Sequence, residues 1–228
     1  MTISANRLTA AAGICAAAAG AIFIAVQINH PPADVAHLVT TEMVVRETAK
    51  ALMAVLALAG FTGIFLRHLG RFGVLGLAGY LLLTVGYLAL FAVQCIVAYV
   101  LPTVAQSNPV YVQDFLDAAM GGSLTGNIGY MPVVFLVSGF GYSLGGLLFG
   151  IALFRAGVLA RWASALLAVS TTSALALAVL PESFSRPLAV PTGVALIGLG
   201  VSLWRDQRRQ AGTVDAPATV PVPEPATR

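Results

Sequence analysis

Four charged residues lie close together in a chain that is otherwise largely apolar: Glu42, Arg46, Glu47 and Lys50. On a helix, the i,i+4 spacing of Glu42 and Arg46 and the i,i+3 spacing of Glu47 and Lys50 both allow ion pairs. Beside a membrane such a cluster could form an outer vestibule for an ion or a small solute. It could equally be a helix end whose paired charges extend toward water. We expect the helix end, in which Arg46→Gln or Lys50→Gln costs little because exposed pairs contribute about 0–1 kcal/mol.

Ser143 lies in a second pattern that could carry chemistry, the G-x-S-x-G sequence of residues 141–145. A serine on the fourth of six apolar segments is similar to the arrangement in rhomboid intramembrane proteases, which pair it with a histidine on the sixth. The three histidines of this chain, His30, His37 and His68, all precede residue 69. No histidine base can therefore activate Ser143 from the sixth segment. The sequence predicts a glycine packing face here and no catalytic residue.

Metal and cofactor sites are not predicted. His30 and His37 lie outside the apolar segments, whereas bis-histidine haem ligation needs two rings facing each other from different helices. Asp114 and Asp117 have no third ligand beside them, and we expect both carboxylates on a solvated helix face.

Membrane helices must position all of these residues. Of the 228 residues, 58% are hydrophobic and 9% charged, with a mean hydropathy of +0.90, whereas soluble domains carry about 25% charged residues. Six continuously apolar segments are long enough to cross a bilayer as helices. These are residues 8–28, 49–66, 72–101, 130–154, 158–180 and 188–204. The sequence predicts an all-α polytopic membrane helix bundle with six transmembrane helices within residues 1–205.

The basic residues predict the orientation of this bundle. Nine of them fall on one side if the helices alternate: Arg7, Arg67, Arg71, Arg155, Arg161, Arg205, Arg208, Arg209 and Arg228. The other side has Arg46, Lys50 and Arg186. Because loops rich in Lys and Arg stay in the cytoplasm, we predict cytoplasmic amino and carboxyl ends in the cell (plasma or inner) membrane. The net charge of +3 reflects this topology and gives no reason to expect nucleic acid as a partner.

The connections and the tail give further expectations. Asp34 occupies a potential N-cap position, so the second helix is expected to begin near Val35 and to project from the membrane. In the longest connection, Asn108-Pro109 predicts the start of a short amphipathic helix at about 109–120 on the outer surface. Residues 206–228 are rich in proline and are predicted to form a disordered cytoplasmic tail.

Glycines predict where the helices touch. Small residues spaced by four let helix backbones approach closely in lipid. Two pairs on the fourth segment have this spacing, Gly141/Gly145 and Gly146/Gly150, and the start of the third segment is lined by Gly70, Gly73, Gly76 and Gly79. We expect a tight bundle with little room for a large cavity. The lipid bilayer is its expected partner, and a membrane or cytoplasmic protein could bind through the glycine face of the fourth helix or through the tail.

Three segments resemble those of a loosely defined group of multi-pass membrane proteins from high-GC bacteria. These are His30-Pro31-Pro32, the Arg155–Trp162 turn and Leu203-Trp204-Arg205, although the group usually has proline where this chain has Ala160. Eleven arginines against one lysine fit such a genome. The resemblance implies a topology and no chemistry.

Two functions remain open from the sequence. The first is a non-enzymatic structural, accessory or sensing component that works through partners. The alternative is a small-solute or ion transporter or channel whose outer vestibule is formed by Glu42, Arg46, Glu47 and Lys50.

Overall fold

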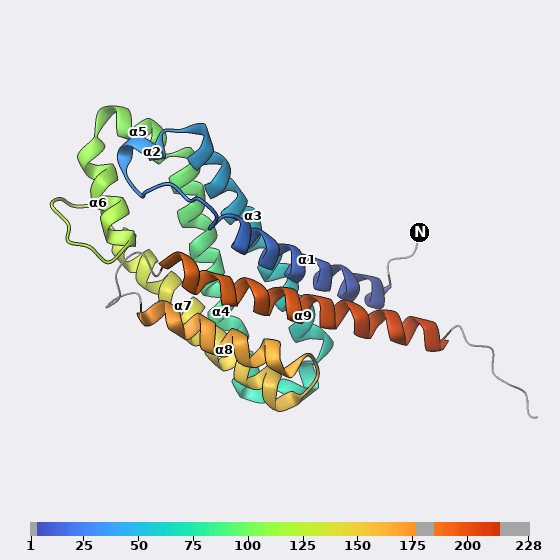
Figure 1. Cartoon of the computed structure of the whole chain (residues 1–228). Helices are drawn as coiled ribbons and strands as arrows, with labels where there is room; N and C mark the ends of the chain where they lie inside the picture. The colour runs from blue at the N-terminus through green and yellow to red at the C-terminus, as the bar shows by residue number, and fades with distance from the viewer. Residues whose placement is uncertain (1–3, 177–184, 215–228) are drawn as a thin grey trace, which may run out of the picture.

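The computed structural model describes residues 4–176 and 185–214. Every regular element in these residues is a helix (Figure 1), which confirms the all-α class for this part of the chain. The helices are α1 (Ala5–Ala25), α2 (Val35–Leu38), α3 (Thr41–Arg67), α4 (Leu69–Tyr99), α5 (Leu101–Ser107), α6 (Pro109–Ala119), α7 (Met131–Ala156), α8 (Arg161–Ala176) and α9 (Ser185–Val214).

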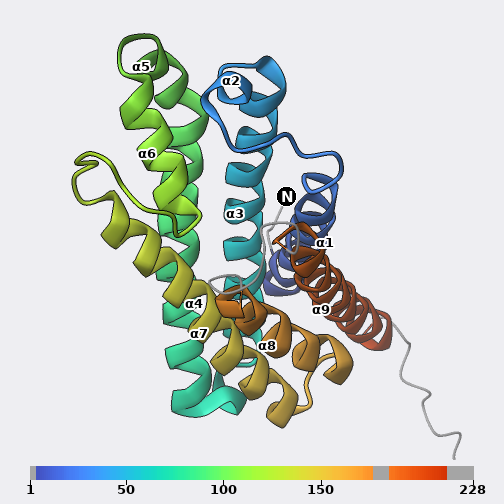
Figure 2. The same ribbon diagram turned by 60° about the vertical axis from the view of Figure 1, so that its left-hand side comes forward.

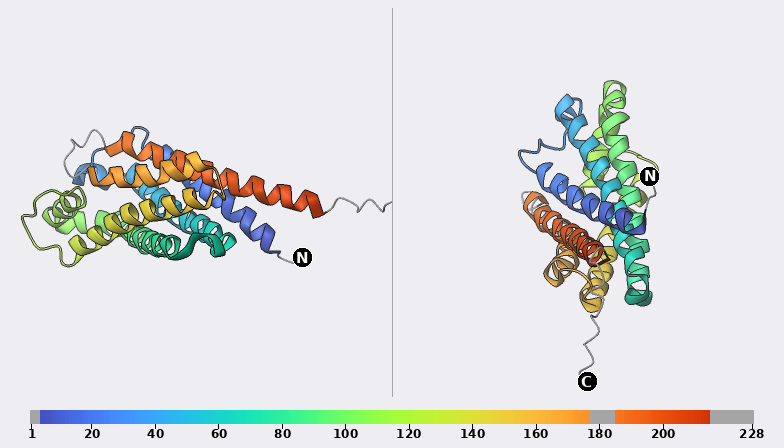
Figure 3. Two further views of the ribbon diagram at one scale, coloured as in Figure 1. Left: turned by 90° about the horizontal axis from the view of Figure 1, so that it is seen from below. Right: turned by 90° about the vertical axis from the view of Figure 1, so that its right-hand side faces the viewer.

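Six helices form a closed ring in which neighbours in the sequence are neighbours in space. The order is α1, α3, α4, α7, α8 and α9, and α9 packs back along α1. Figure 2 shows α1 and α9 side by side. Figure 3 shows that the amino end of α1 and the carboxyl end of α9 lie on the same side of the molecule. The three short helices α2, α5 and α6 gather at the other end of the ring and form a cap over it.

Five ring helices are long and apolar enough to cross a membrane: α1, α3, α4, α7 and α9. Their outward faces carry exposed large apolar side chains, including Leu52, Leu81, Leu88, Leu136 and Phe140, which is typical of a multi-pass membrane protein. The fifth predicted span, residues 158–180, coincides with α8, whose described part has 16 residues. The remainder of that span, 177–180, lies outside the described residues, so six spans and cytoplasmic ends stay predictions.

Large aromatic side chains fill the interior of the ring. Phe61, Tyr87 and Phe149 are almost completely buried. The Phe61 ring packs edge-on against the other two, with centroid distances of 5.6 Å to Tyr87 and 5.7 Å to Phe149. Such T-shaped pairs add about 0.5–1.5 kcal/mol each beyond the burial of their area.

The glycine face on α7 packs within the chain itself. A Cβ added at Gly141 or Gly145 would lie 2.7 Å or less from the α4 backbone, and one at Gly150 would lie 2.7 Å from the α8 backbone. The bundle is therefore tight along these helices. The prediction was wrong for Gly70 and Gly73, because a Cβ at either would meet nothing within 4 Å. Gly73 instead has φ 57° inside α4, a conformation that favours glycine and that kinks the helix.

Two predicted boundaries were wrong. The helix expected to begin near Val35 is broken: α2 ends at Leu38, and α3 starts after Thr40, whose side chain caps it by accepting from the Met43 amide at 3.3 Å. At the other end of the chain, α9 continues to Val214, so residues 206–214 are helical where a disordered tail was predicted. Residues 215–228 lie outside the described part.

Candidate functional site

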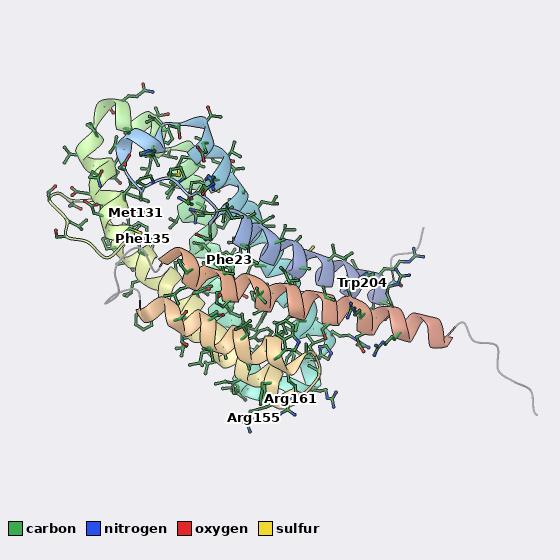
Figure 4. The ribbon with its side chains drawn as sticks, in the orientation of Figure 1. Phe23, Met131, Phe135, Arg155, Arg161 and Trp204 are labelled. Atoms are coloured by element: carbon green, nitrogen blue, oxygen red, sulfur yellow. The ribbon has the colours of Figure 1, made fainter. Side chains whose placement is uncertain are left out.

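A second apolar cluster, separate from the interior of the ring, holds the cap in place. It joins Leu38 of α2, Met43 of α3, Val97 of α4 and Phe115 of α6. Phe115 packs edge-on against Phe135 of α7, with ring centroids 5.1 Å apart; Figure 4 labels Phe135 and Met131 at this end of the molecule. The four charged residues of α3 lie where the cap meets the ring.

Arg46 ties the end of α1 to α3. Its guanidinium donates to the carbonyl oxygens of Val26 (3.2 Å), Ile28 (2.9 Å) and Asn29 (3.2 Å), which lie in the turn that follows α1. It also donates to Glu42 Oε1 at 3.0 and 2.8 Å, as the spacing predicted. Glu42 and Arg46 therefore fix the turn that leads to His30, and neither lines the cavity beneath the cap.

Glu47 and Lys50 line a cavity of about 340 Å³ between the cap and the ring. Its polar lining residues are His30, Asp34, Glu47, Lys50, Gln94 and Ser138. Apolar side chains from four helices form much of the remaining wall, including Leu38, Met43, Leu90, Val93 and Phe135. Two of the four residues of the predicted vestibule, Glu47 and Lys50, therefore lie at this cavity, and their role in binding a solute stays a prediction.

Three ionisable side chains meet at the inner wall of this cavity. Lys50 Nζ donates to Glu47 Oε1 at 2.5 Å, as the i,i+3 spacing predicted. His30 Nε2 lies 3.7 Å from the same oxygen, too far for a hydrogen bond. The Glu47 and His30 side chains are only 5% and 4% exposed. The Glu47 carboxylate is expected to remain charged, because protonating it would leave the Lys50 charge without a compensating partner at this depth, which is costly.

The His30 ring has a defined tautomer. Its Nδ1 lies 2.7 Å from the carbonyl oxygen of Pro31, and because a carbonyl only accepts, Nδ1 must carry the proton. In the neutral ring Nε2 is then an acceptor. This atom is buried and has no hydrogen-bond partner among the described residues. Two acceptors, His30 Nε2 and Glu47 Oε1, therefore face each other across the gap of 3.7 Å and together suit a hydrogen-bond donor from a bound molecule.

Gln94 and Ser138 supply polar groups from the α4 and α7 side of the cavity. Ser138 Oγ donates to the Gly86 carbonyl at 3.4 Å. The Gln94 amide makes no hydrogen bond to any residue that the structure describes. No spacing in the sequence connects Gln94 or Ser138 to Glu47, and the sequence did not identify His30 as a partner of the cluster. The proline after His30 was a local signal, since its carbonyl orients the ring.

The carboxylates of Asp34 and Asp114 accept hydrogen bonds from backbone amides rather than from a solute. Asp34 caps α2 by accepting from the His37 amide at 2.8 Å, the position predicted for it. The expectation that Asp114 is solvated was wrong: it is 3% exposed and accepts from the amides of Thr125 and Gly126, both at 2.8 Å. These backbone hydrogen bonds lower the pKa of both carboxyl groups below its usual value.

Ser143 is 1% exposed, and its hydroxyl has no hydrogen-bond partner among the described residues. Its glycine neighbours are pressed against α4, a setting that offers no room for a substrate. Within residues 4–176 and 185–214, no group of three or more His, Cys, Asp or Glu side chains is arranged to hold a metal ion.

Comparison with known proteins adds no relative. No protein family, no curated protein and no solved structure matches the chain. The resemblance to multi-pass proteins of high-GC bacteria therefore stays a prediction, and the case for a function rests on the cavity.

Proposed function

We propose that the protein is an integral membrane protein of the cell membrane that binds a small amphiphilic solute beneath its cap, and that it serves as a sensing or accessory component without catalysing a reaction. One observation carries this proposal: His30 Nε2 is buried without a hydrogen-bond partner among the described residues, 3.7 Å from Glu47 Oε1, at the wall of a cavity that is otherwise mainly apolar. Buried polar atoms without partners are rare in folded proteins and favour a bound molecule at that point.

The lining residues of the cavity indicate which kind of solute would fit. Leu90, Val93 and Phe135 suit an apolar body, while the two acceptors suit a hydroxyl or an N–H group at one end. Lys50 already donates to Glu47, which leaves the cluster near neutrality and disfavours an anionic solute. The volume of about 340 Å³ is at the small end of ligand pockets. The distribution of arginines supports an orientation in which the cap faces outward.

Transport of the same solute is the second candidate, because Glu47 and Lys50 line the cavity as a vestibule would require. A pathway would have to cross the aromatic layer of Phe61, Tyr87 and Tyr142, which lies deeper in the ring and in which the Tyr87 and Tyr142 rings are 5.9 Å apart. This closed layer favours binding over transport.

A matched set of eight-carbon probes tests the proposal in lipid nanodiscs: 1-octanol, octylamine, octanoate and octane. At pH 8, where imidazole is ordinarily neutral, octanol and octylamine should bind saturably after subtraction of binding to empty nanodiscs. Octanoate, whose head group only accepts hydrogen bonds, should bind more weakly.

The variant Glu47→Gln should weaken octanol binding roughly tenfold, the factor for loss of about one charge-assisted hydrogen bond. Glu42→Gln is the matched control on the same helix, outside the cavity, and should bind like the wild type. Absence of saturable binding, or equal loss in both variants, would contradict a solute site beneath the cap. Flux of octylamine into proteoliposomes would favour the transporter instead.

A further inference from the structure

At the opposite end of the molecule from the cap, an open groove of about 550 Å³ runs between the start of α8 and residues 194–209 of α9. One wall carries Val194, Ile197 and Val201, and its end carries Arg205 and Arg209. These five positions follow one face of α9 with spacings of three or four residues. An apolar strip and a basic end therefore form one continuous surface.

Trp162 forms the α8 side of this groove. Its indole lies directly over Gly198, because a Cβ built there would be 2.5 Å from the ring. The residue is nevertheless 58% exposed. A half-exposed tryptophan beside arginines is typical of the level of lipid head groups. A hydrogen bond of 3.0 Å from the Ala160 amide to Ser202 Oγ fixes this turn against α9 and keeps the groove open.

The basic end has a net positive charge, since two guanidinium groups and one carboxylate, Asp206, line it. Arg205 is exposed, and among the described residues it has no ion-pair partner. A planar guanidinium binds phosphate oxygens in a bidentate manner. The exposed Arg205 can thus bind an anion at this end of the groove.

We propose that this groove binds an anionic phospholipid, whose phosphate contacts Arg205 and Arg209 and whose acyl chain lies along Val201, Ile197 and Val194. From Arg205 to Val194 the helix rises roughly 16 Å, about half of the ~30 Å hydrocarbon core, so one chain can follow the strip within one leaflet. Free phosphate would use the basic end alone and leave the strip unexplained. The site is independent of the cavity beneath the cap.

Native mass spectrometry with equal amounts of dioleoyl phosphatidylglycerol and dioleoyl phosphatidylcholine tests this site. The wild type should retain phosphatidylglycerol preferentially. The double variant Arg205→Gln/Arg209→Gln should lose that preference by roughly tenfold, as expected when a charge-assisted phosphate contact is removed.

Arg208→Gln supplies the matched control, because the Arg208 guanidinium stacks over the Trp204 ring at 5.2 Å and does not line the groove. It should retain phosphatidylglycerol like the wild type. Equal retention of the two lipids by the wild type, or equal loss in the control, would overturn the proposal. Thermal protection by inorganic phosphate equal to that by the lipid would overturn it too, because it would show an anion site without a lipid.

Discussion

At the scale of single residues, the charged cluster on α3 divides into two pairs with different tasks. The pair Glu42–Arg46 fastens the turn after α1, whereas Glu47–Lys50 faces the cavity. The side chain of Arg46 is 19% exposed, against 58% for Glu42. An exposed ion pair alone would contribute little, but three backbone carbonyls also depend on Arg46.

We therefore expect Arg46→Gln to cost more than the sequence suggested. Losing hydrogen bonds from a charged donor to Val26, Ile28 and Asn29 should lower the free energy of unfolding by about 1–3 kcal/mol. Glu42→Gln removes the ion pair but keeps these carbonyl contacts, so it should cost less than about 1 kcal/mol. Unfolding in mixed micelles measures both; equal small losses would show that the turn does not depend on Arg46.

At the scale of elements, the cap depends on a buried carboxylate. Asp114 of α6 accepts hydrogen bonds from the loop at Thr125 and Gly126, and this lowers its pKa. A group with a lowered folded-state pKa stabilises the protein fully above its unfolded value of about 3.9, and this stabilisation is lost as the pH falls through the folded value. The loop from residue 121 to residue 130 should therefore loosen only in acid, below about pH 4.

Asp114→Asn should produce the same loosening at neutral pH. Hydrogen exchange at the Thr125 and Gly126 amides, corrected for the intrinsic pH dependence of exchange, should rise several-fold, since these donors lose a charged acceptor. Asp117→Asn is the control, because the Asp117 side chain accepts from Gln113 within α6 and not from the loop. Unchanged exchange in Asp114→Asn would mean that other contacts hold the loop.

At the scale of the whole molecule, the ring gathers its basic ends on one side. Arg155 and Arg161 lie together in Figure 4 at the turn between α7 and α8. Burial lowers the pKa of His68, at the α3–α4 turn, and the nearby Asp206 carboxylate of α9 acts in the opposite direction. This arrangement agrees with the alternation of charges from which a cytoplasmic side was predicted. Labelling can determine which side of the membrane these basic ends face.

Single cysteines in a background without Cys15 and Cys95 can report that side. Cysteine at Arg155 or Arg208, both exposed, should react only after the membrane is permeabilised. Cysteine at Val110 of α6, which is 62% exposed, should react from outside. Asp114 would be a poor reporter because it is buried. External labelling at residue 155 would reverse the predicted orientation and place the cap cavity in the cytoplasm.

The sequence alone determined the features that depend on neighbours within about four residues. Apolar segment length identified the five long helices, and capping preferences placed Asp34 and Asn108 correctly at the starts of α2 and α6. Helical spacing likewise identified the ion pairs of Glu42 and Glu47. These interactions are local, so the chain specifies them before any helices meet.

Tertiary structure decided which of these residues share a site. His30, Gln94 and Ser138 join Glu47 from three other segments of the chain, and no spacing in the sequence encodes that meeting. The burial of Asp114 likewise depends on Thr125 and Gly126, which lie in the loop that follows its own helix. Such contacts arise only when the cap closes on the ring, because packing between distant segments, and not helix periodicity, sets which polar atoms are removed from solvent.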